Sequence, residues 1–118
     1  AVLAAGALLI GGIGSVDAAN WYTVGTDSNG ITWSIDNDSV KKDDKKAVLD
    51  IKAMDYEGYH YIVTEEFNHK KREVKDVKVT LYNPKGEVVK QEQPSKSTRK
   101  VEQGTPAYAV YTLIWGDK

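Results

Sequence analysis

Residues suited to acid–base, nucleophilic or metal chemistry are scarce in this chain. It contains no cysteine and two histidines, His60 and His69, whose spacing forms no His-x-x-x-His metal motif. No serine lies in a Gly-x-Ser-x-Gly turn, and no Gly-x-x-x-x-Gly-Lys phosphate loop is present. The sequence therefore predicts no catalytic residue, no metal site and no cofactor, and it favours a protein that is not an enzyme.

Two pairs of carboxylates are the remaining candidates for such chemistry. Asp36 and Asp38 begin a short irregular segment, whereas Asp43 and Asp44 lie inside the charged run at residues 41–46. Neither pair has the spacing of an EF-hand calcium loop, and four lysines flank the second pair. Both pairs are therefore interpreted as solvated turns.

A basic cluster at Lys70, Lys71 and Arg72 is the first candidate binding surface. Its cations could hold a sulfated glycan or an acidic protein segment through charge-assisted contacts. Three further cations in a polar segment are candidates to join it: Lys96, Arg99 and Lys100. The alternative is that these lysines serve solubility and protect a strand edge from pairing.

An aromatic cluster at Tyr59, His60 and Tyr61, close to Tyr56, is the second candidate binding surface. Exposed tyrosines often anchor protein interfaces. In a strand, Tyr59 and Tyr61 would lie on one face and His60 on the other, so that part of the cluster would pack in the core. Haem binding through His60 or His69 is a further alternative, because histidine is a common axial ligand of haem iron.

Composition divides the chain into two parts. Residues 1–19 (AVLAAGALLIGGIGSVDAA) carry one charge, and their apolar stretch is shorter than the roughly 20 residues of a membrane-spanning helix. This pattern predicts a secretory signal segment, with a retained anchor or a buried apolar hairpin as alternatives. Residues 20–118 are then one exported domain, located at the cell surface, in the periplasm or outside the cell.

The charge balance of the predicted domain restricts its partners. Residues 20–118 contain equal numbers of acidic and basic side chains, so the domain as a whole has no attraction for nucleic acid. Membrane contact is expected only through residues 1–19, if they are retained. The absence of cysteine excludes a disulfide scaffold.

Alternation of apolar and polar residues predicts an antiparallel sheet of five to six strands. The clearest alternation sets Val77, Val79 and Leu81 against their polar neighbours. Asn29-Gly30 predicts a type I′ turn, and residues 93–100 are expected to form a loop. The expected strands cover residues 21–24, 31–36, 48–54, 59–67, 77–82 and 87–91.

Residues 105–115 have strand-like composition but helix-like ends. Thr105 suits an N-cap, Pro106 the first helical position and Gly116 the residue after a helix. An apolar stripe with helical spacing could lie across the sheet: Ala107, Val110, Tyr111 and Ile114. The fold class predicted is therefore α+β and mainly β, with one antiparallel sheet and a C-terminal helix packed on it.

The order of these features resembles that of the bacterial surface-adhesin protein E family. The resemblance rests on four segments: residues 20–24 (NWYTV), 36–40 (DNDSV), 81–89 (LYNPKGEVV) and 104–107 (GTPA). It implies an antiparallel sheet with a C-terminal helix, displayed on the cell envelope and attached to host matrix or serum proteins or, in some members, to haemin. Relatives often carry cysteines, whereas this chain has none, so a stapling disulfide and a lipid anchor are not transferred.

The expected function is that of a non-enzymatic, exported bacterial binding protein with a macromolecular partner. That partner would be a host or envelope protein, or a sulfated glycan. The alternatives are a structural envelope protein that self-assembles through a sheet edge, as a homo-oligomer, and a small-molecule carrier for haem.

Overall fold

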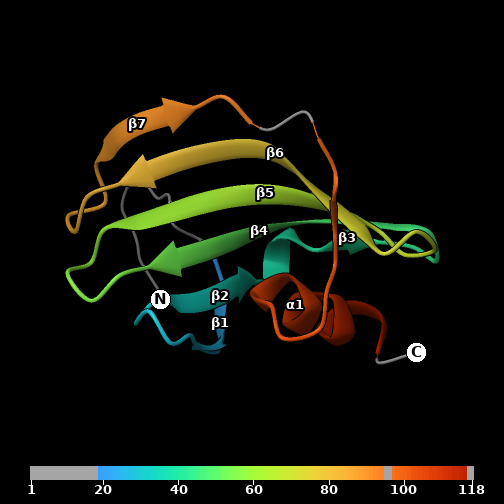
Figure 1. Ribbon diagram of the computed structural model, residues 1–118. Helices are drawn as coiled ribbons and strands as arrows, with labels where there is room; N and C mark the ends of the chain where they lie inside the picture. The colour runs from blue at the N-terminus through green and yellow to red at the C-terminus, as the bar shows by residue number, and fades with distance from the viewer. Residues whose placement is uncertain (1–18, 95–96, 117–118) are drawn as a thin grey trace.

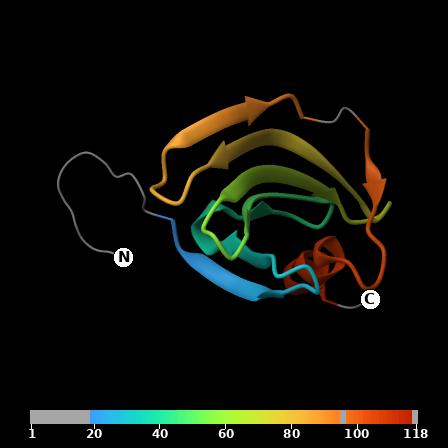
Figure 2. The same cartoon turned by 60° about the vertical axis from the view of Figure 1, so that its left-hand side comes forward.

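An antiparallel sheet of eight strands makes up most of the structure, and one helix lies on its concave side (Figures 1 and 2). The computed structural model describes residues 19–94 and 97–116; the predicted export segment, apart from Ala19, lies outside these residues. The strands are β1 (Trp21–Thr26), β2 (Thr32–Asp36), β3 (Lys41–Lys42), β4 (Lys46–Met54), β5 (His60–Asn68), β6 (Glu73–Tyr82), β7 (Val88–Glu92) and β8 (Arg99–Lys100). A 3₁₀ turn, η1 (Asn37–Ser39), follows β2, and the helix is α1 (Pro106–Trp115).

Two very short strands account for the difference from the predicted five to six. The main path of the sheet runs β1-β2-β4-β5-β6-β7, while β3 pairs with β4 and β8 pairs with the start of β6. Both extra strands consist of two exposed basic residues, so they carry no alternation of apolar and polar side chains. Residues 93–100 were expected to be a loop, and this expectation is wrong for β8, which is held by pairing to β6.

Three hairpin turns at one end of the sheet share one construction. They begin at Asp27, Asp55 and Asn83, and each side chain accepts hydrogen bonds from backbone N–H groups two and four residues ahead. A glycine three residues after each start has positive φ. The type I′ turn predicted at Asn29-Gly30 is therefore wrong, because such a turn needs positive φ at both residues and only Gly30 has it.

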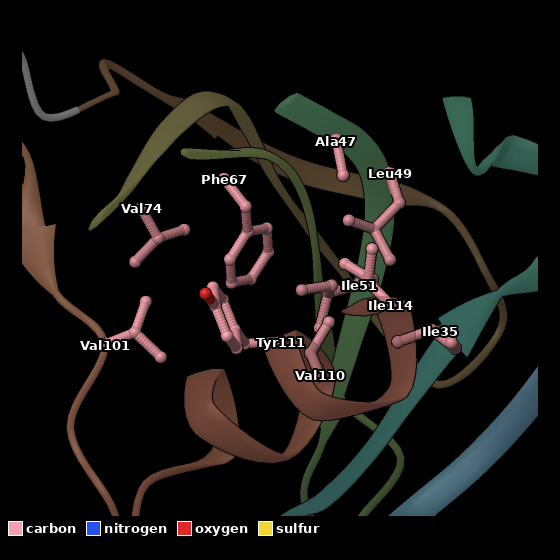
Figure 3. Packing of buried hydrophobic residues seen from close by; sticks show 10 residues of the cluster. All are labelled: Ile35, Ala47, Leu49, Ile51, Phe67, Val74, Val101, Val110, Tyr111 and Ile114. Carbon is pink, nitrogen blue, oxygen red and sulfur yellow. The ribbon is translucent and has the colours of Figure 1, made fainter. Parts of the chain in front are cut away.

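The core lies between the concave face of the sheet and α1 (Figure 3). Ala47, Leu49 and Ile51 alternate along β4 and are all buried, as the period-two pattern predicts. Phe67 on β5 lies opposite Ala47 and is also fully buried. The other core residues are Ile35, Val74, Val101, Val110, Tyr111 and Ile114.

A bulge in β6 shifts the face to which its residues point. Thr64 pairs with Lys78, but Glu65 pairs with Asp76, so Val77 is an extra residue between the two pairs. Val77 is 46% exposed, and Thr80 on the other face is buried. The strand predicted at residues 77–82 is confirmed as part of β6, but the alternation does not place Val77 in the core, because period-two alternation does not continue through a bulge.

The C-terminal helix follows the predicted signals at both ends. The Thr105 side chain accepts a hydrogen bond from Tyr108 N–H, and Gly116 ends the helix with φ of 88°. Val110, Tyr111 and Ile114 are buried against the sheet. Within residues 19–94 and 97–116, no helix has the length and apolar character needed to cross a membrane.

Candidate functional site

The two surfaces predicted from the sequence lie at opposite ends of the sheet. Lys70 to Arg72 follow the end of β5, whereas Tyr59 precedes its start. A nine-residue strand separates them, which corresponds to about 30 Å at 3.3 Å per residue. They are therefore two separate surfaces, named here the basic end (residues 43–46 and 69–72 with Lys100) and the turn end (residues 27–31, 55–59 and 83–87).

At the basic end, two charged turns that are distant in the sequence lie side by side. His69 N–H donates to Lys45 O at 2.9 Å, and His69 Nδ1 lies 2.8 Å from Asp44 O. Because a carbonyl only accepts, the proton of this second bond is on Nδ1. Figure 1 shows the β3–β4 and β5–β6 turns together at the right-hand side of the sheet. The run at residues 41–46, interpreted from sequence as a solvated turn, thus adjoins the basic cluster.

Aromatic side chains of α1 fix His69 in this position. The Trp115 ring stacks on the His69 ring with a centroid separation of 4.3 Å and an interplanar angle of 2°. Tyr111 donates from its hydroxyl to His69 O at 2.9 Å, and Trp115 Nε1 donates to Asp43 O at 3.0 Å. The helix therefore holds both turns of the basic end.

The cations of the basic end differ in how they are paired. Lys46 approaches Glu66 at 3.7 Å, and Lys100 approaches Glu73 at 3.5 Å while also donating to Lys71 O. Three exposed lysines form no ion pair with any described residue: Lys45, Lys70 and Lys71. The Arg72 guanidinium lies over the Tyr111 ring at 5.6 Å from its centroid. These side chains form a locally basic surface on a neutral domain.

The other predicted members of the basic cluster behave differently. Lys100 joins it, as expected, through the contact with Lys71. Arg99 instead turns its guanidinium to Glu65 and Asp76, at 3.0 and 3.2 Å. Lys96 lies outside the described residues.

Two exposed tyrosines lie at the turn end, and a third, Tyr61, lies next to it on β5. Tyr56 is 89% exposed and Tyr59 is 43% exposed, whereas Tyr61 is half-buried on the α1 side of β5. The Tyr61 hydroxyl donates to Glu92 at 2.9 Å, and this hydrogen bond, together with burial and the Glu92 charge, raises the pKa of Tyr61. His60 lies on the opposite face, as predicted, and its ring stacks on Tyr82 at 5.3 Å.

The hairpin turn that begins at Asp27 stabilises the negative charge of the Asp27 carboxylate. Trp33 Nε1 donates to Asp27 at 2.9 Å, and the N–H groups of Ile31 and Asn29 donate to the same carboxylate. These hydrogen bonds, that of Trp33 foremost and then that of Ile31, lower the pKa of Asp27, although burial acts in the opposite direction. At the basic end, the N–H groups of Lys45 and Lys46 lower the pKa of Asp43 in the same way.

A buried glutamate, Glu65, with the partly buried Asp76 beside it, lies next to the core and was missed from the sequence. Glu65 points to the α1 side between Val63 and Phe67, with its side chain 12% exposed, and Asp76 is opposite it on β6. Burial, then the hydrogen bond and charge of Asp76, raise the pKa of Glu65 to about 8, against the opposing effect of Arg99. The sequence signal for a buried Glu65 was its position on the inward side of the alternating run of β5. No sequence pattern near Arg99 identifies Arg99 as the residue that pairs with Glu65.

The histidines occupy different environments at the two ends. His60 and His69 are separated by β5, so they cannot ligate one haem iron together. Across the described parts of the chain, no group of three His, Asp or Glu side chains converges as metal ligands would. The Asp36–Asp38 pair lies at η1, and its interpretation as a solvated turn is wrong for Asp36. This side chain is buried because its carboxylate caps the turn, accepting hydrogen bonds from Asp38 N–H and Asn20 N–H.

Comparison with known proteins provides no relative for this chain. No protein-family model, no curated protein and no solved structure matches it.

Proposed function

We propose that residues 20–118 form a non-enzymatic, exported surface-binding domain of the protein E-like adhesin kind, which holds an anionic macromolecular partner at its basic end. The observation that carries the proposal is the meeting of two lysine-bearing turns, fixed by the hydrogen bonds of His69 to Asp44 and Lys45. Lysines without ion-pair partners in the described chain, carried by two turns whose backbones are held together, suit sulfate or carboxylate groups spaced along a chain. A sulfated glycan or an acidic protein segment has this chemistry.

Anchoring of the turns supports this function over mere solubility. A lysine that serves solubility needs no fixed backbone, whereas here Trp115 and Tyr111 hold the residue that joins the two turns. The exported location and adhesin-like role rest on the apolar leader and on the resemblance of the sequence segments. The tyrosines of the turn end belong to a separate surface and are not part of this site.

Binding to immobilised heparin and to matrix proteins tests the proposal. A triple variant, Lys45→Ala with Lys70→Ala and Lys71→Ala, removes the three unpaired lysines. A matched control removes three exposed lysines elsewhere: Lys78, Lys85 and Lys90. Because exposed ion pairs are worth up to about 1 kcal/mol each, the first variant is expected to bind about tenfold to hundredfold more weakly at low salt. The control should bind almost as the wild type does.

Each other outcome decides against part of the proposal. Equal losses in the two variants would show attraction to total charge rather than to the basic end. Unchanged binding by the first variant would remove the basic end as the site, and absence of binding by the wild type would remove the adhesin-like role. Light scattering and a haemin titration test the two rivals, self-assembly and haem carriage.

A further inference from the structure

A groove separates α1 from the edge of the sheet at β1. Its volume is about 400 Å³. Ile35 and Ile114 form its floor and are nearly fully buried, whereas Tyr22 and Leu113 on its two sides are each about half exposed. Two apolar side chains facing solvent across an apolar floor are typical of a surface that accepts another apolar side chain.

The strand beside this groove is an edge that lacks charged residues and proline. Among the described strands, β1 pairs only with β2, so its outer backbone N–H and C=O groups face away from the sheet. Its sequence, WYTVGT, contains no charge and no proline, whereas the opposite edge strand, β7, carries Lys90 and Glu92. Charged residues and proline are what commonly prevent an edge strand from pairing with another chain.

The edge and the groove are positioned to act together. Tyr22 pairs with Ile35, so both side chains point to the α1 side of the sheet. A strand added outside β1 would place its own inward side chains next to Tyr22, over the groove. The bulge between Thr23 and Gly25 limits regular pairing to the first half of β1.

The charge at the groove defines the partner further. Among the residues that the structure describes, Lys42 is the one charged residue that lines it. Its Nζ donates to Ile114 O at 2.7 Å, which leaves two N–H donors, and it forms no ion pair with any carboxylate in the described ranges. A carboxylate on the occupant would complete this site.

We propose that β1 and this groove dock an extended segment of a partner protein by strand addition. The segment has apolar side chains at the positions that face the groove and an aspartate or glutamate that reaches Lys42. A peptide strand is favoured over a small amphiphile because the groove lies beside an edge strand, whose outer backbone groups offer a peptide main-chain hydrogen bonds that an amphiphile cannot form. The site shares no residue with the basic end and stands independently of the function proposed there.

Fluorescein-labelled hexapeptides provide the test with the full chain. The probe alternates valine and threonine and carries one aspartate; one companion replaces the aspartate by asparagine, and another is N-methylated at alternate amides. Anisotropy measures binding, and amide NMR shifts locate it. The probe is expected to bind with shifts at β1 and Leu113, the asparagine companion to bind at least about threefold more weakly, and the N-methylated companion not to bind.

Variants assign the contacts. Leu113→Lys, at a half-exposed position, should weaken the probe about tenfold, whereas Val88→Lys on β7 should not, although Val88 is similarly exposed. Lys42→Met should abolish the preference for aspartate over asparagine, and Lys42→Arg should retain it. Thermal unfolding verifies that each variant is folded.

Three results would overturn the proposal. One is no binding of the probe up to about 1 mM, the range of very weak complexes. Another is equal binding of the N-methylated peptide, since strand addition requires its amides. The third is saturable binding of sodium laurate that depends on Lys42 and Leu113, prevents binding of the probe and causes no NMR shifts along β1. That result would identify a site for small amphiphiles instead.

Discussion

Replacing Glu65 with glutamine is expected to remove a loss of stability that the wild-type protein suffers as the pH rises. The pKa of Glu65 is raised from its ordinary value of 4.5 to about 8, mainly by burial and then by Asp76. In the unfolded chain the group is solvated, and its pKa returns near the ordinary value. Between these two pH values, the folded protein therefore holds a proton on Glu65 that the unfolded chain has released.

The sign of the effect follows from this extra proton. The free energy of unfolding falls as the pH rises wherever the folded state binds more protons, by at most about 1.4 kcal/mol per pH unit for one group. The contribution of Glu65 is complete below pH 4.5 and is lost once the pH passes about 8. Over the whole window, the loss is at most about 5 kcal/mol.

Glutamine reproduces the protonated side chain without being able to ionise. Its amide offers a donor for Asp76, and its carbonyl offers an acceptor for Arg99, which lies 3.0 Å from Glu65 Oε2 in the wild type. The E65Q variant should therefore match the wild type within about 1 kcal/mol at pH 5 and exceed it by about 2 to 4 kcal/mol at pH 9. The difference should grow steadily between these two values.

Urea unfolding, followed by tryptophan fluorescence at unit steps from pH 5 to pH 9, measures this difference. Groups that titrate equally in both proteins cancel, because only the difference in unfolding free energy between the two is used. Glu66→Gln is the control. Glu66 lies on the other face of β5, 3.7 Å from the exposed Lys46, and because an exposed ion pair contributes little, its substitution should change the free energy of unfolding only slightly. Parallel stability curves for E65Q and the wild type would refute the reasoning.

Two further predictions concern the packing of the turns and of α1. In chemical denaturation, Gly58→Ala should destabilise the fold by about 1 to 3 kcal/mol, and by more than Gly86→Ala does. Both glycines have positive φ, but a Cβ added at Gly58 would lie 3.1 Å from Pro84, whereas a Cβ added at Gly86 would have no other atom within 4 Å. Equal losses of stability would exclude the Pro84 contact as the cause. Tyr111→Phe should cost about 1 to 3 kcal/mol and speed amide exchange in residues 69–72, because His69 O loses its hydroxyl donor; unchanged exchange would contradict the anchoring role of α1.

The sequence was most informative where structure depends on neighbouring residues. The caps at Thr105 and Gly116 identified α1 despite its strand-like composition, because capping depends on residues within one turn. Alternation located β4 and β5 for a similar reason. It was misleading at Val77, since the bulge is defined by pairing with β5 rather than by the sequence of β6.

The candidate binding surfaces could not be predicted from local sequence patterns, because they are formed by contacts between segments that are distant in the sequence. The adjacency of the turns at Asp44 and His69 depends on the register of β4 against β5 and on Trp115, more than 40 residues further along the chain. The groove likewise joins Tyr22 to Leu113. For the same reason Arg99, which looks like a member of the basic cluster, is instead the partner of the buried Glu65 and the partly buried Asp76.

The two ends of the sheet are stabilised in different ways, and this difference bears on function. Glycines with positive φ relieve the backbone in the turns of the turn end, but at the basic end Arg72 itself has φ of 52°, in the region that disfavours side chains. Holding a non-glycine residue there costs about 1 kcal/mol or more, and the contact of its guanidinium with Tyr111 offsets part of that cost. Glycine at this position would relieve the strain but would remove a cation from the surface. A charged residue kept in a strained conformation, on turns anchored by Tyr111 and Trp115 of α1, is the arrangement expected where the position of the charge matters more than the stability of the turn.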